Sequence, residues 1–189
     1  MRDLPEDRNG FRFRGGSTVL DLAATLQARQ TAAPRDLLAH PEDLDRWLVS
    51  AGLAASLPGA TENDLAAARI LREAIFALAC SLQNPLLDAA ACQILNQIAA
   101  EPAAAPALTA DGRVELRGLV AGLLASLARD AVRLFGGRDS SRIRQCQSAS
   151  CSIFFVDTSR SGDRRWCSMS GCGNKAKVAE FRRRKRQSE

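Results

Sequence analysis

The sequence contains no tyrosine and one histidine, and aromatic residues fill only 5% of its 189 positions. A site with several imidazole ligands is therefore excluded within one chain, and a catalytic Ser–His or Cys–His pair would have to use His40. His40 precedes a proline at a predicted helix start, and no nucleophile or metal-ligand pattern surrounds it. We interpret it as an exposed residue beside a helix cap. Glycine-rich phosphate loops and nucleophile elbows are also missing, so we expect no enzymatic activity.

Long apolar segments are missing too. No run approaches the roughly 20 residues that cross a bilayer, and residues 1–16 lack the apolar stretch of a secretory signal. We therefore expect a cytoplasmic protein without membrane contact. Because thiols stay reduced there, the six cysteines predict metal ligands, buried side chains or reactive groups rather than disulfides. Cys80 and Cys92, set among alanine and leucine, are predicted to be small buried hydrophobic residues.

The charge is distributed unevenly along the chain. Residues 1–137 carry 13 basic and 16 acidic side chains, whereas residues 138–189 carry 13 basic and only 5 acidic ones. Four of the six cysteines also lie in the second segment. These two changes coincide and predict an alanine-rich helical domain over 1–137 and a small basic domain over 138–189.

The first segment shows mainly helical periodicity. Apolar residues recur at intervals of three and four within residues 17–30, 41–51, 61–82, 85–98 and 116–135. Thr61 and Asp64 form a capping pair at the start of the strongest amphipathic stretch. Between the last two helices, residues 107–117 predict two short strands joined by a turn at Asp111 and Gly112. The predicted fold class is mainly α, with one minor β-hairpin.

The second segment contains a metal-site spacing. Four cysteines, Cys146, Cys151, Cys167 and Cys172, follow a C-x4-C-x15-C-x4-C pattern. Two close pairs separated by an insert as long as a hairpin suit a tetrahedral zinc ion, and four thiolates leave no position for a catalytic water. One structural zinc is therefore the predicted cofactor. A redox thiol switch and inert free cysteines are the alternatives.

The residues around the cysteines predict a small folded finger. Residues 153–156 read as one strand and 164–166 as its partner, and Cys172 opens a helix. A hairpin followed by a helix that holds the last ligand resembles a treble-clef finger. Its predicted core consists of Phe154, Phe155, Trp166, Val178 and Phe181. Such a small core predicts that the finger is unfolded without metal.

Basic side chains cluster in this segment and are candidates for binding nucleic acid. The predicted contacts are Arg160, Arg164, Arg165, Lys175, Lys177, Arg182 and Arg183. Release of counterions from DNA favours binding of such a patch to phosphates, so DNA is the favoured partner. Two alternatives stay open: a solubilising tail, and a zinc module that docks on another protein.

Several sequence motifs are similar to known families. The run RRWCSMSGCGNKAK, with the preceding cysteine pair and FFVDTSRSG, resembles the CGNR zinc finger of bacterial proteins. The segments VLDLAATLQAR, PEDLDRWLVSAGL and ALTADGRVELRG resemble the ABATE domain that precedes that finger. The resemblance implies a bacterial transcription regulator with zinc ligands at the four cysteines named above. The CGNR motif falls on Cys172, Gly173, Asn174 and Lys175. Lysine replaces arginine here, which keeps the charge but removes bidentate contact.

Together these observations predict a non-enzymatic regulator that binds DNA through its finger. The helical domain is expected to sense a small-molecule effector or to mediate self-association as a homodimer. An adaptor that binds only proteins is the main alternative. An enzyme with a pocket among the helices is the third.

Overall fold

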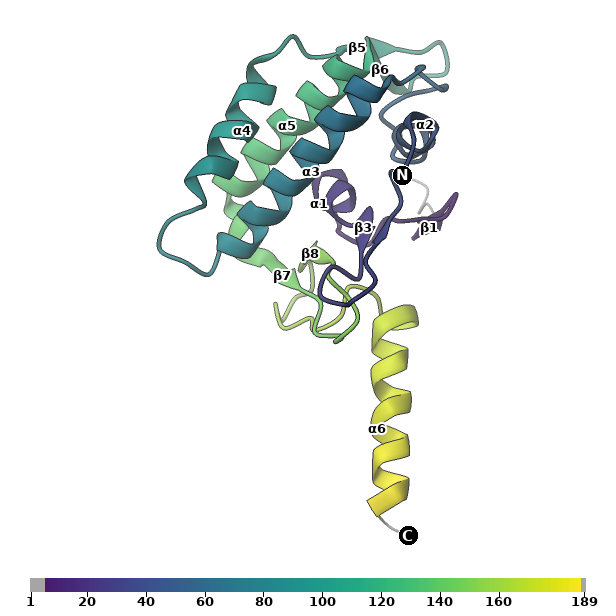
Figure 1. Ribbon diagram of the computed structural model, residues 1–189, viewed down its shortest axis with the longest axis vertical. Helices are drawn as coiled ribbons and strands as arrows, with labels where there is room; N and C mark the ends of the chain where they lie inside the picture. Colours follow the sequence, from purple (N-terminus) through teal and green to yellow (C-terminus); the bar gives the residue numbers. More distant parts are fainter. Residues whose placement is uncertain (1–5, 188–189) are drawn as a thin grey trace.

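The computed structural model describes residues 6–187 and shows a mainly helical chain, as predicted. The α-helices are α1 (Thr18–Ala23), α2 (Pro41–Ser50), α3 (Glu62–Ser81), α4 (Ala89–Ala100), α5 (Val120–Gly136) and α6 (Asn174–Gln187). Within residues 6–187, no helix is both long and apolar enough to cross a membrane. Helices α3, α4 and α5 lie side by side, and α1 packs beneath them against α3 and α5 (Figure 1).

Among the described residues, the strands form four separate antiparallel pairs. They are β1 (Asp7–Arg8) with β2 (Phe11–Arg12), β3 (Leu26–Gln27) with β4 (Arg35–Asp36), β5 (Ala105–Leu108) with β6 (Val114–Arg117), and β7 (Ile143–Gln145) with β8 (Phe154–Val156). Because each pair has only two strands, its order depends on packing against the helices.

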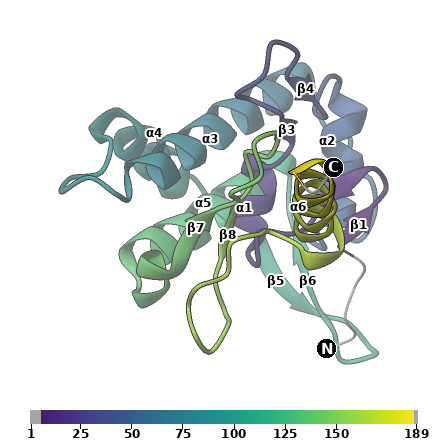
Figure 2. The same cartoon turned by 90° about the horizontal axis from the view of Figure 1, so that it is seen from below.

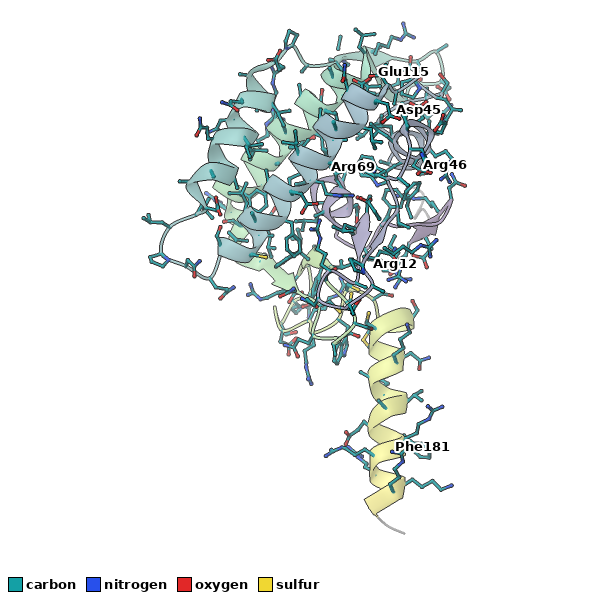
Figure 3. The ribbon with its side chains drawn as sticks, viewed as in Figure 1. Arg12, Asp45, Arg46, Arg69, Glu115 and Phe181 are labelled. Atoms are coloured by element: carbon teal, nitrogen blue, oxygen red, sulfur yellow. The ribbon has the colours of Figure 1, made fainter. Side chains whose placement is uncertain are left out.

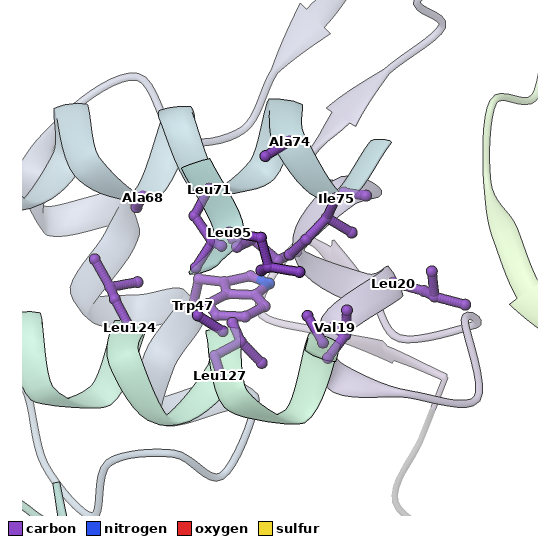
Figure 4. Packing of buried hydrophobic residues seen from close by; sticks show 14 of the residues in the cluster. Val19, Leu20, Trp47, Ala68, Leu71, Ala74, Ile75, Leu95, Leu124 and Leu127 are labelled. Atoms are coloured by element: carbon purple, nitrogen blue, oxygen red, sulfur yellow. The ribbon is translucent and has the colours of Figure 1, made fainter. Parts of the chain in front are cut away.

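The helical core is centred on α3. Thr61 accepts the amide of Asp64, whose carboxylate accepts the amide of Thr61, so the predicted capping pair is confirmed. Trp47 of α2 is fully buried and lies among side chains from α1, α3 and α5, including Leu71 and Leu127 (Figure 4). Each such large apolar side chain contributes about 1.5–3 kcal/mol on burial, which makes this core the main source of stability in the helical region.

Several predicted boundaries were wrong. The helix predicted over 17–30 ends at Ala23, because Leu26 and Gln27 pair with β4 and Ala28 adopts a left-handed φ of 54°. The helix predicted from residue 85 begins after Asp88, whose carboxylate accepts the amide of Ala91. Strand pairing in the first case and a capping hydrogen bond in the second override the apolar periodicity.

The predicted hairpin is present, but its turn is longer than two residues. Thr109 donates its amide to the Arg113 carbonyl at 2.8 Å, and three residues lie between them. Gly112 donates to the carbonyl of Thr109 and has a φ of 78°, a left-handed conformation that favours glycine. This geometry is that of a three-residue hairpin loop.

The hydrophobic core continues across the predicted boundary at residue 137, which stays a prediction. Ile143, Phe154 and Val156, from β7 and β8, belong to the same buried cluster as the helical core. The ring of Phe154 meets Phe76 of α3 edge-on, with centroids 5.5 Å apart. One side of the C-terminal region is thereby anchored on the helices.

Helix α6 leaves the rest of the molecule and points away from it (Figure 1), and Figure 2 shows it nearly end-on. None of residues 174–186 is buried. Figure 3 shows their side chains spread around the helix, with Phe181 labelled among them. Because these residues are not buried, α6 gains little stability from packing, and an isolated helix of 14 residues is only marginally stable in water.

Candidate metal centre

Four cysteines of the C-terminal region meet at one point. Cys146 follows β7, Cys151 precedes β8, and Cys167 and Cys172 precede α6. Their sulfur atoms all lie within 4.8 Å of one another, and all four residues are buried. The structure thus brings together all four residues that the spacing singled out.

The sulfur geometry fits a tetrahedral zinc ion. Thiolates about 2.3 Å from zinc place neighbouring sulfur atoms about 3.8 Å apart in a tetrahedron. The Sγ atoms of Cys151 and Cys167 are 3.8 Å apart, and those of Cys167 and Cys172 are 3.7 Å apart. The cluster forms one zinc-binding site, consistent with a single structural ion. Four thiolates would saturate the ion, which then organises the fold rather than activating water.

The first cysteine pair is shaped by a tight turn. The amide of Cys146 donates to the Ile153 carbonyl, and the amide of Cys151 donates to the Ser148 carbonyl, both at 2.9 Å. The amides of Ser148 and Ile153 in turn donate to the sulfur atoms of Cys146 and Cys151. Each sulfur therefore accepts an amide from the second residue after its own, which favours the thiolate form that zinc requires.

The second pair lies on either side of Ser168. The Ser168 carbonyl accepts the amide of Gly173 at 3.0 Å, closing the turn Met169–Gly173 that carries Cys172 into the start of α6. The Ser168 hydroxyl donates to the carboxylate of Glu6 at 2.7 Å. The metal loop is consequently tied to the beginning of the chain.

Electrostatics explain why this cluster needs a cation. A hydrogen bond with Cys146 is the largest cause that raises the pKa of Cys151 to about 12. Hydrogen bonds with Cys146 and Cys151 likewise raise the pKa of the Cys167 thiol. The pKa of Cys146 is lowered, because it accepts hydrogen bonds from its neighbours. Four adjacent thiolates repel one another, and a divalent ion removes this repulsion while displacing the protons.

The predicted strand pairing in the finger was wrong. Strand β8 pairs with β7 rather than with residues 164–166, which form no strand. Residues 164–166 instead lie beside the segment after β7, where the Arg165 carbonyl accepts the amide of Gln147 at 3.0 Å. Register with β7 places Phe154 and Val156 on the helical core and Phe155 on the zinc side.

The predicted finger core was correct only in part. Phe154 and Phe155 are buried and Trp166 is partly buried, but Val178 and Phe181 are 41% and 69% exposed. Their spacing of three predicted a core face, yet nothing within residues 6–187 buries this side of α6. The finger instead recruits Ala24 from the end of α1 into its buried cluster.

The seven predicted nucleic-acid contacts fall into two groups. Arg164 is turned toward the finger: its guanidinium donates to the carbonyls of Trp166 and Cys167 and lies over the Phe155 ring. Arg165 donates to the side chain of Gln147 and lies over Trp166. Arg165 is nevertheless exposed, as are the other five: Arg160, Lys175, Lys177, Arg182 and Arg183. The four on α6 share one projecting element.

Three further residues, Arg14, Asp21 and Cys80, have surroundings that the sequence did not predict. Arg14 packs against Gly171, which lies between the two cysteines of the second pair, and no sequence pattern links positions so far apart. Asp21 is buried, and burial raises its pKa to about 7, although the Gly15 amide and nearby Arg8 oppose the change. Cys80 is exposed, contrary to prediction, because it lies on the outer face of α3.

Family comparisons agree with the order of these regions. Residues 16–138 match ABATE, described as a putative stress-induced transcription regulator. Residues 142–185 match the CGNR zinc finger. No curated protein matches the chain.

Proposed function

The chain belongs to the ABATE family, and from this premise we propose that it is a non-enzymatic transcription regulator that contacts DNA through α6. A CGNR finger follows the ABATE domain in the same chain, which supports a regulator that carries its own binding module. In this proposal the zinc ion only supports the finger, and α6 makes the contact.

The exposed basic surface of α6 is the observation that carries the proposal. At 1.5 Å per residue, its 14 residues are about 21 Å long. The helix projects from the body (Figure 1), so a duplex could approach without meeting the helical region. The major groove of B-DNA admits one α-helix, and basic side chains around the helix would reach phosphates on both sides of the groove.

The apolar residues of α6 suit the same position. Val178 and Phe181, at i and i+3, lie on one side of the helix and are exposed. Apolar side chains in the major groove contact thymine methyl groups. Lys175 replaces the arginine of the CGNR motif, so we assign it a phosphate contact rather than bidentate reading of a base.

For the helical region, we propose a role as sensor or oligomerisation module. An apolar groove of about 460 Å³ lies between α3 and α4 and is lined in part by Ile70, Ala77 and Ile94. This groove would accept an apolar effector or a second copy of the chain. A dimer would allow recognition of a palindromic site.

The test compares two charge-matched double variants of the full-length, zinc-loaded protein. One is Lys177→Gln with Arg182→Gln on α6, and the control is Arg113→Gln with Arg117→Gln on the β5–β6 hairpin. Each removes two exposed positive charges. Binding to a labelled 25-base-pair duplex is measured by fluorescence anisotropy between 50 and 300 mM salt. With about five phosphate contacts, log affinity should fall with log salt at a slope near −4.5.

The α6 variant should shift this slope by about 2 toward zero, and the control should leave it unchanged. Equal effects of both variants would indicate a general charge effect and contradict a contact through α6. Absence of salt-dependent DNA binding would instead favour the protein-binding adaptor.

A further inference from the structure

The N-terminal strap, residues 6–16, connects the helical region to the metal loop. It contains β1 and β2 and is closed by the amide of Phe13, which donates to the Glu6 carbonyl at 2.7 Å. Asn9 donates to the Ser50 hydroxyl of α2, while Gly15 accepts the amide of Val156 in β8. Nearly all of the strap precedes the segment matched by the ABATE family.

Within the strap, Arg14 reaches the metal loop, as Glu6 does through its hydrogen bond with Ser168. Its side chain is 12% exposed. A Cβ added to Gly171, which follows Ser170 in the turn before Cys172, would lie only 2.5 Å from the Nη1 atom of Arg14. The guanidinium therefore rests directly on the backbone of this turn. It also attracts the thiolate of Cys167 electrostatically.

Two acidic side chains of the strap also pair with Arg14. Its Nη2 atom donates to the carboxylate of Asp7 at 2.6 Å, and its Nε lies 3.5 Å from the carboxylate of Glu6. Both carboxylates are about half exposed, at 57% and 49%. Solvent screens these two charges, whereas the sulfur cluster is buried and its charge is screened much less.

The net charge of the zinc-loaded cysteine cluster explains why a positively charged side chain beside it is favourable. Zn²⁺ with four thiolates has a formal charge of −2, and burying a net charge is unfavourable without a nearby counter-charge. Arg164 lies on the finger side, but its guanidinium is engaged with two carbonyl oxygens. We propose that Arg14 is a positioning residue for zinc: it supplies the counter-charge from outside the finger and thereby couples metal retention to the helical region.

The experiment compares two variants of Arg14 in the full-length protein. Arg14→Met keeps most of the length and packing of the side chain but removes the charge, and Arg14→Lys keeps the charge. The zinc dissociation constant is measured by competition with a chromophoric chelator. Changes in residues that support metal ligands typically weaken binding 10–100-fold, and we expect this for Arg14→Met. Arg14→Lys should weaken zinc binding less than Arg14→Met does, because it keeps the positive charge.

Two further measurements separate charge from folding. Arg113→Met on the β5–β6 hairpin, which lies at the end of the molecule away from the finger (Figure 1), removes a positive charge from a side chain that is 80% exposed, so it should not alter zinc affinity. In the cobalt-substituted protein, the thiolate-to-metal absorption band should stay the same in Arg14→Met, because the four ligands are unchanged. A shifted or weakened band would show that the substitution distorts the ligand set, which overturns the proposal.

If Arg14→Met does not fold, Gly171→Ala provides the test. The added methyl group must displace the guanidinium while the charge stays in the chain. Gly171 has no left-handed φ, so the backbone accepts alanine there. We expect weaker zinc binding in the same direction as for Arg14→Met. Unchanged zinc affinity in Arg14→Met or in Gly171→Ala would overturn the proposal. Equal weakening of zinc binding by Arg14→Met and Arg14→Lys would also overturn it.

Discussion

The helical region and the finger are held together by different forces. Helices α1 to α5 surround a continuous cluster of buried apolar side chains, including Trp47 and Leu71, which are fully buried. The zinc-side cluster has seven buried members, and four of them are the cysteine ligands. One region therefore depends on removal of apolar surface from water, and the other depends on an ion.

Strand β8 lies on the border between these two regions. Its side chains alternate, so Phe154 and Val156 belong to the helical core while Phe155 belongs to the zinc side. The finger is therefore not an independent unit, since one side of the β7–β8 hairpin packs on the helices. Perturbing either region should leave part of β8 in place.

Metal removal should have the largest effect and should divide the two regions most clearly. Zinc binding to small fingers is worth about 10–16 kcal/mol at neutral pH, and that stabilisation disappears on chelation. The two tryptophans report on one region each: Trp166 lies beside the zinc cluster and Trp47 lies in the helical core. Chelation should red-shift the emission of a Trp47→Phe variant, in which Trp166 is the probe.

The complementary variant, Trp166→Phe, should keep its Trp47 emission and most of its far-ultraviolet helical signal after chelation. Re-addition of zinc should reverse the change at Trp166. A red shift at both tryptophans would show that the helical core also depends on the ion, which contradicts the proposal that only the finger does.

A cavity in the helical core should have the next largest effect. Leu71 on α3 is fully buried, and Leu→Ala at such a site costs about 3–5 kcal/mol through lost transfer energy and the cavity that remains. The adjacent Ile70 is 52% exposed, so Ile70→Ala should cost less than about 1 kcal/mol. Urea unfolding followed by Trp47 emission measures both. Similar losses in the two variants would contradict the placement of the core.

Comparing the predicted and observed structures of the two regions shows which features the sequence could predict. The capping pair at Thr61 and the periodicity of α3 were correct, because local hydrogen bonds and one-sided burial coincide there. The cysteine spacing likewise specified the cluster, since four soft ligands near one another leave few other uses. Both signals are local in the chain.

The errors came from contacts between distant positions. Strand β8 chose β7 over residues 164–166, and apolar contacts with α3 explain that choice, which a local pattern does not contain. Arg14 and Gly171 lie in separate regions of the sequence and meet only in the fold. Val178 and Phe181 show the reverse error, because helical spacing predicted a buried face and the described part of the chain leaves both side chains exposed.

A somewhat smaller change in the free energy of unfolding is expected when the pH is varied, because Asp21 titrates near the junction of the two regions. Burial raises the pKa of Asp21 to about 7, above its ordinary value of 3.8. The folded chain therefore keeps this proton between about pH 4 and 7, whereas the unfolded chain loses it. As a result, the contribution of Asp21 to the free energy of unfolding falls as pH rises through this window. The fall amounts to a few kcal/mol, because a tenfold difference in proton affinity corresponds to about 1.4 kcal/mol.

Asp21→Asn removes this titration while keeping a side-chain oxygen that can accept the amide of Gly15. Its free energy of unfolding should therefore change less between pH 4 and 8 than that of the parent, as measured by urea titration at each pH. The nearby Arg8 stays charged throughout this range. A slope identical to that of the parent would show that Asp21 does not titrate differently on unfolding.

The smallest effect on stability is expected at Phe181, which tests the contrast within the finger itself. Phe181 is 69% exposed on α6, so Phe181→Ala should change the free energy of unfolding by less than about 0.5 kcal/mol and leave zinc retention unaltered. Phe155→Ala is the matched control, because Phe155 is fully buried beside the ligands and should cost about 3–5 kcal/mol. Thermal unfolding and chelator competition measure both variants. A loss of more than about 1 kcal/mol of unfolding free energy in Phe181→Ala would show that α6 packs on the rest of the protein. Such packing would contradict the proposal that α6 enters the DNA groove as a free helix.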